Sequence, residues 1–98
     1  MNIEEILESE KLTLLITGKI DTTTAPELDN LLSERYESIN ELVLDFAEVK
    51  YISSAGLRVL LNAVKMMSTK GGLKLKNVGP STMEVFEMTG FAAILNIE

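Results

Sequence analysis

The stretch Glu41-Leu42-Val43-Leu44-Asp45-Phe46 decides the fold, because a helical pattern that begins at Ser53-Ser54 follows it. The apolar run at residues 41–46 is too short for a helix, so it predicts a buried strand. In the second segment, Leu and Val residues recur with helical spacing as far as Met67, and the pair Gly71-Gly72 ends the pattern. A buried strand followed by an amphipathic helix indicates an α/β protein.

The segments before this unit predict a hairpin and a further helix. Residues 3–10 and 12–17 have strand-like patterns and are separated by a short connection. A helix is expected from Thr24 to about Tyr36, with Thr24 and Glu27 as its capping box.

The segments after this unit repeat the alternation of strand and helix. Residues 73–78 alternate with period two, which predicts a strand. A third helix is expected from Pro80 to Gly90, with a capping box from Ser81 to Glu84. Residues 94–97 are expected to form a short last strand.

The resulting order is β-β-α-β-α-β-α-β, which predicts one α/β domain over residues 1–98. Alternating strands and helices imply right-handed crossovers and a mostly parallel sheet of about five strands. The N-terminal strand joins this sheet as an antiparallel neighbour, and three or four helices pack on it.

The composition excludes most classes of enzyme. The chain has no His and no Cys, which removes imidazole catalysis, thiolate nucleophiles, disulfides and the usual zinc ligands. Its 98 residues carry 9 Lys and Arg against 15 Asp and Glu, and this charge of −6 disfavours nucleic acid and anionic membranes as partners. No signal peptide and no apolar run of about 20 residues is present, so we expect a cytoplasmic protein.

Two polar segments are expected to meet at the carboxyl edge of the sheet. They are residues 18–24 and 47–54, and together they bring Asp21, Ser53 and Ser54 to one edge. Either serine can cap the helix that follows. A hydroxyl at a helix N-terminus is also a good place for a phosphate, and spacing leaves both interpretations open.

The second helix carries further candidates. Arg58 lies one turn after Ser54, within reach of a phosphate there, although a solvated arginine on the helix face is the simpler interpretation. Val59, Ala63 and Met66 form an apolar row beside the core-facing row. A helix this apolar can offer one side to a partner.

The motif Tyr51-Ile52-Ser53-Ser54-Ala55-Gly56-Leu57 resembles the signature of STAS-domain anti-sigma factor antagonists. Three further stretches resemble the same family in the same order, so that the likeness spans nearly the whole chain. They are Gly18-Lys19-Ile20-Asp21 with Ala25 and Leu28, then Lys70-Gly71-Gly72-Leu73, and finally Phe86-Glu87-Met88-Thr89-Gly90-Phe91.

The resemblance implies a regulator that is not an enzyme and needs no cofactor or metal. Such proteins bind a serine kinase that doubles as the anti-sigma factor, are inactivated by phosphorylation, and are reset by a serine phosphatase. The acceptor maps to Ser54, flanked by Asp21, Ser53, Ala55 and Gly56. The chain departs from the family pattern where Ser53 replaces the usual Asp and Ala55 the usual Ser or Thr, which leaves Ser53 as a second candidate acceptor.

Partner contacts are expected on the second helix, through Arg58, Val59, Asn62 and Met66, with the protein a monomer or weak dimer. One alternative is a STAS adaptor subunit of a transporter or stress-sensing assembly, without a phosphorylation switch. Another is a nucleotide-binding module, for which the chain has no glycine-rich phosphate loop.

Overall fold

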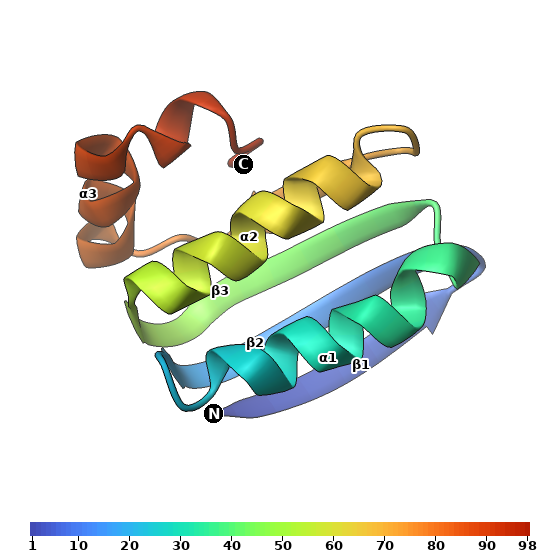
Figure 1. The fold of residues 1–98 in the computed structure, drawn as a ribbon, viewed down its shortest axis with the longest axis horizontal. Coiled ribbons are helices and arrows are strands. Elements are labelled where there is room, and N and C mark those ends of the chain that lie inside the picture. The colour runs from blue at the N-terminus through green and yellow to red at the C-terminus, as the bar shows by residue number, and fades with distance from the viewer.

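Every predicted α-helix is present, and four strands form the sheet (Figure 1). The computed structural model describes residues 1–98. The strands are β1 (Asn2–Glu8), β2 (Lys11–Ile20), β3 (Glu41–Ile52) and β4 (Leu73–Lys76). The α-helices are α1 (Ala25–Arg35), α2 (Ser54–Met67) and α3 (Pro80–Thr89), and short 3-10 turns lie at η1 (Tyr36–Ser38) and η2 (Phe91–Ala93).

The sheet has the order β1-β2-β3-β4, with β1 antiparallel to β2 and the other neighbours parallel. This confirms the predicted α/β fold with an antiparallel N-terminal strand. The expectation of about five strands is wrong. Residues 94–97 contribute only one bridge, between Leu75 and Ile97, because the amides of Ile94 and Leu95 still donate to Phe91 in the turn that follows α3.

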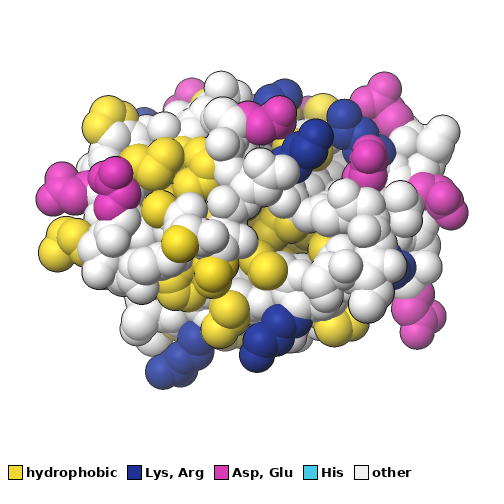
Figure 2. Space-filling view, turned by 90° about the horizontal axis from the view of Figure 1, so that it is seen from above, with side chains coloured by type: hydrophobic (Ala, Val, Ile, Leu, Met, Phe, Trp, Pro, Cys, Tyr) yellow, Lys and Arg dark blue, Asp and Glu magenta, His cyan; other side chains and the backbone are white.

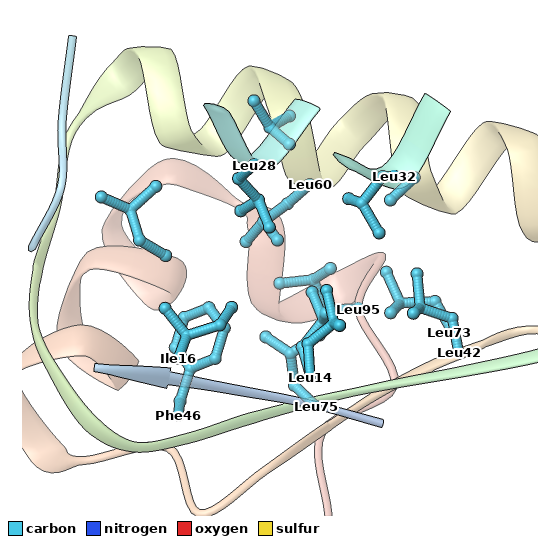
Figure 3. Close-up of a cluster of buried hydrophobic side chains, with 14 of the residues drawn as sticks. Leu14, Ile16, Leu28, Leu32, Leu42, Phe46, Leu60, Leu73, Leu75 and Leu95 are labelled. Atoms are coloured by element: carbon cyan, nitrogen blue, oxygen red, sulfur yellow. The ribbon is translucent and has the colours of Figure 1, made fainter. Parts of the chain in front are cut away.

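The core lies between the sheet and the helices, and leucines from both layers meet there (Figure 3). Leu14 of β2 points toward Leu28 of α1 and Leu60 of α2. These three side chains are fully buried, as is Leu44, which pairs with Leu14 on the neighbouring strand. Phe86 of α3 packs on Phe46 of β3, with ring centroids 6.2 Å apart. All three helices therefore cover the same face of the sheet.

The helix ends differ in part from the sequence predictions. Ser53 caps α2 and Gly90 ends α3 in the left-handed conformation, with φ at 84°, as expected. The two predicted capping boxes are wrong. Thr24 makes no capping bond, and α3 begins after Gly79 without a side-chain cap, so Ser81 lies inside the helix.

Candidate functional site

The carboxyl ends of β2 and β3 lie side by side and bring the two polar segments together. Ile20 pairs with Ile52 at the last position of both strands, and the Ser53 amide donates to the Ile20 carbonyl at 2.9 Å. Asp21 and Ser53 therefore follow neighbouring strand ends, as predicted. Much of each segment is strand rather than loop, since β2 continues to Ile20 and β3 to Ile52.

Asp21 organises the turn between β2 and α1. Its Oδ1 accepts hydrogen bonds from the amides of Thr23 and Thr24, both at 3.0 Å, and the Asp21 amide donates to Thr24 Oγ1 at 2.9 Å. These bonds, the Thr24 amide first, hold the pKa of the Asp21 carboxyl below its usual value. Asp21 thus takes the role predicted for Thr24 and fixes the loop beside Ser53.

The two serines of the motif have different roles. Ser53 is half-buried, and its Oγ accepts from the Gly56 amide at 3.4 Å, which is the N-cap arrangement. Ser54 is exposed at the first position of α2, and its hydroxyl has no hydrogen-bond partner in the protein. The structure therefore leaves Ser54 as the free hydroxyl at the positive end of the helix.

Gly56 lets α2 approach the strand ends closely. A Cβ at this position would lie 2.7 Å from Ile52 Cγ1, 2.8 Å from Ile20 Cγ2 and 3.1 Å from the Ile20 carbonyl oxygen. Only glycine fits without displacing its neighbours, so Gly56 sets the distance between the first turn of α2 and the sheet. Ala55, beside it, is half-buried.

One row of exposed residues runs along α2 from Ser54. Arg58, Asn62 and Met66 follow at intervals of four residues, and each is exposed, Met66 to 45%. The predicted exposure of Val59 and Ala63 is wrong, because they turn toward the core and are 7% and 0% exposed. Val59 reaches the surface in a hollow of about 250 Å³ between α1 and α2, which is also lined by Thr22, Pro26, Asp29, Ala55 and Arg58.

The chain resembles known proteins over nearly its whole length. The family model of the STAS domain matches residues 2–98. The chain belongs to the STAS domain family.

The relatives narrow the class of this STAS domain. It is 31% identical to the anti-sigma-B factor antagonist of Bacillus subtilis over 98 residues, which covers 99% of this chain and 90% of the relative. It is 34% identical to the anti-sigma-B factor antagonist of Listeria monocytogenes over 104 residues, which covers 100% and 90%. The STAS domain thus falls in the anti-sigma factor antagonist family, whose members are regulators without enzymatic activity.

Solved structures agree on the fold. The Bacillus cell fate determinant SpoIIAA in its phosphorylated form matches with a TM-score of 0.77 at 15% identity, over 99% of this chain and 91% of that one. No helix of the STAS domain is long and apolar enough to cross a membrane, and no group of three or more acidic side chains is placed to hold a metal ion.

Sequence reasoning missed the surface that α3 adds beside the site. Tyr51, at the end of β3, is 51% exposed and borders a hollow of about 100 Å³ with Ser81, Thr82 and Val85. Apolar side chains gather on the same end of the molecule, over α3 (Figure 2), where Met88 is 79% exposed. The sequence feature that could have indicated this surface is Tyr51, an aromatic residue in the strand that leads to the two serines.

Proposed function

We propose that this STAS domain is an anti-sigma factor antagonist in a partner-switching module, controlled by phosphorylation of Ser54. The unmodified protein binds a serine kinase that is also the anti-sigma factor, and so releases the sigma factor in the cytoplasm. Phosphorylation ends this binding, and a serine phosphatase restores it. The observation that carries the proposal is the exposed, unbonded hydroxyl of Ser54 at the first position of α2.

Ser54 is a better acceptor than Ser53 for a geometric reason. The Ser53 hydroxyl is engaged in capping α2 and is half-buried, whereas Ser54 projects from the first turn. Ser53 stands where the family has Asp, and both residue types are good N-caps. The replacement therefore keeps the cap and removes one negative charge beside the acceptor.

A phosphate on Ser54 acts on the interface and leaves the fold intact. It adds a charge of about −1.5 to −2 at neutral pH. At the N-terminus of α2 this charge stabilises the helix by roughly 0.3–1 kcal/mol. If Ser54 packs against the kinase, the same charge is buried without a partner on association, which costs several kcal/mol.

The docking surface of the proposal is the exposed row of α2, formed by Arg58, Asn62 and Met66, with Asp21 and Ser53 at its head. Arg58 and Asn62 supply hydrogen-bond donors, and Met66 supplies a flexible apolar contact. Val59 contributes through the floor of the hollow beside Arg58.

Calorimetric titration of the cognate kinase with variants tests the proposal. Ser54→Asp is expected to remain folded and lose affinity by about 10²-fold or more, which corresponds to the several kcal/mol above. Ser54→Ala is expected to bind as well as the wild type. Ser33→Asp, an exposed position in the last turn of α1, is the matched control and leaves affinity unchanged. Equal affinities for Ser54→Asp and the wild type would refute the switch.

A further inference from the structure

One face of the sheet is left uncovered. Figure 1 shows α1 and α2 on a single face, and α3 packs on that side through Phe86 and Phe46. Glu5 of β1 points to the same side, where its carboxylate binds Arg35 of α1 at 2.9 Å. Parallel sheets usually have both faces covered by other elements. In this domain no helix packs on the second face. The opposite face is therefore an unpartnered surface.

Strand register arranges the side chains of this open face in three rows across the sheet. Residues that pair in register point to the same side, so each row follows from the pairing. From β1 toward β4 the rows are Glu4, Leu15, Asp45 and Lys76, then Ile6, Thr13, Val43 and Lys74, and finally Glu8, Lys11 and Glu41.

The charges of the open face are divided between its two sides. Glu4 and Glu8 lie on the β1 side, and Lys74 and Lys76 lie on the β4 side. None of these four forms a salt bridge within the chain. Between them the middle row is apolar or uncharged up to Lys74: Ile6 is 39% exposed, Thr13 is half-buried, and Val43 is only 5% exposed.

We propose that the open face binds a second copy of this chain, related by a two-fold axis parallel to the strands. Such an axis places β1 of one copy over β4 of the other and β2 over β3, at the small inter-strand angle of aligned sheet packing. It also places each row of one copy opposite the same row of the other copy. Glu4 then faces Lys76 of the second copy.

The same axis matches the remaining rows. Lys11 lies opposite Glu41, Thr13 opposite Val43, and Ile6 opposite the aliphatic stem of Lys74. Asp45 is the one charge near the centre of the interface, opposite Leu15. Its carboxylate is already hydrogen-bonded within its own chain. Its Oδ1 accepts from the Ala47 amide at 3.0 Å and from Asn77 Nδ2 at 3.1 Å.

The size of the face suits a weak dimer. The molecule measures 33 Å by 26 Å along its two longest axes, and the sheet, with four strands about 4.8 Å apart, is narrower, at roughly 15–20 Å. This face is smaller than the roughly 800 Å² that each partner gives to a standard interface, as expected of a weak contact. Because the face is largely polar, we expect a dissociation constant on the order of 10–100 µM.

The dimer leaves the candidate site free. Ser54 lies on α2, on the covered side of the sheet, and at the carboxyl end of β3. A two-fold axis parallel to the strands keeps both carboxyl ends at the same end of the dimer. The two copies of Ser54 would therefore face a partner together. The dimer therefore forms whether or not Ser54 is phosphorylated.

Sedimentation equilibrium of the full chain over a concentration series tests the dimer. Lys76→Glu and Glu4→Lys should each weaken dimerisation by about 10-fold or more, because each reverses a contact that occurs twice per dimer. The double variant, with both changes, should recover to within about threefold of the wild type, because it restores the pairing with the signs exchanged.

The control and the contrary outcomes are equally specific. Lys65→Glu, an exposed position on α2, changes the net charge as Lys76→Glu does and should leave the dimer unchanged. A wild type that stays monomeric up to about 1 mM overturns the proposal. A dimer that is unaffected by Lys76→Glu also overturns it and points to pairing through the edge of β1. Thermal melts of each variant identify any loss of fold.

Discussion

Replacing Gly56 by Ala tests whether the close approach of α2 to the sheet holds the site in place. The added methyl would lie 2.7 Å from Ile52 and 2.8 Å from Ile20. Both isoleucines are buried in the core, at 3% and 0% exposure, so neither can swing aside. Overpacking of this kind costs about 1–3 kcal/mol. Replacing a helical Gly by Ala recovers up to about 1 kcal/mol, so we expect a net loss of up to about 2 kcal/mol.

Urea unfolding followed by circular dichroism measures this loss at neutral pH. Ser54→Ala is the control, because it changes an exposed side chain of the same turn and should stay within about 0.5 kcal/mol of the wild type. If Gly56→Ala is as stable as the wild type or more stable, helix propensity dominates. The close approach of α2 to the strand ends would then not require glycine at position 56.

Four other predictions concern single side chains. The buried Tyr36 hydroxyl has no hydrogen-bond partner, so Tyr36→Phe should raise the free energy of unfolding by about 1 kcal/mol in urea melts, and a loss would contradict this. Burial raises the pKa of Tyr36 from 10.0 to about 12, so the wild type should lose stability between pH 10 and 12, by about 2–3 kcal/mol, and Tyr36→Phe should not. Because the pKa of Asp21 is lowered, its contribution to stability is present above pH 3.8 and is lost as the pH falls through the folded value. The urea midpoint of Asp21→Asn should therefore depend less on acid pH than that of the wild type. An unchanged acid dependence would refute the stabilising role of the Asp21 carboxylate. Leu44→Ala should cost roughly 2–5 kcal/mol, whereas Met66→Ala should cost little stability and weaken kinase binding in a pull-down; equal stability losses would place Met66 in the core.

The parts of the fold that follow from regular periodicity could be predicted from the sequence. The helix after Ser53 is an example, because its apolar residues recur with uniform helical spacing. The antiparallel first strand followed from its short connection to the next strand. The second half of β3 could not be predicted. Val49 and Ile52 are buried while Lys50 and Tyr51 are exposed, so irregular pairing with β2 breaks the period-two pattern that identifies a strand.

Contacts between distant segments account for the other differences. The last residues looked like a strand because Ile94, Leu95 and Ile97 favour one, yet Ile94 is 48% exposed and only residues 96–98 reach β4, through a single bridge at Leu75. Likewise, Thr24 matches the pattern of an N-cap, but its hydroxyl accepts from the Asp21 amide and donates to the Lys19 carbonyl instead of accepting from the Glu27 amide. A local pattern cannot show which of several backbone groups the Thr24 hydroxyl binds.

The candidate site was predictable in its location and only partly in its roles. The carboxyl-edge rule brought Asp21, Ser53 and Ser54 together, and their proximity is confirmed. Which serine caps the helix depends on where the first turn begins, and the sequence left that open. The buried state of Val59 depends on the packing of α1 against α2, which single-helix periodicity does not describe.

Mapping the phosphorylated residue tests the central claim most directly. The wild type, Ser54→Ala and Ser53→Ala are each incubated with the cognate kinase and ATP, then digested and sequenced by mass spectrometry. We predict one phosphate on Ser54 in the wild type and in Ser53→Ala, and none in Ser54→Ala. Phosphate on Ser53 of the wild type, or none on either serine, would contradict the account.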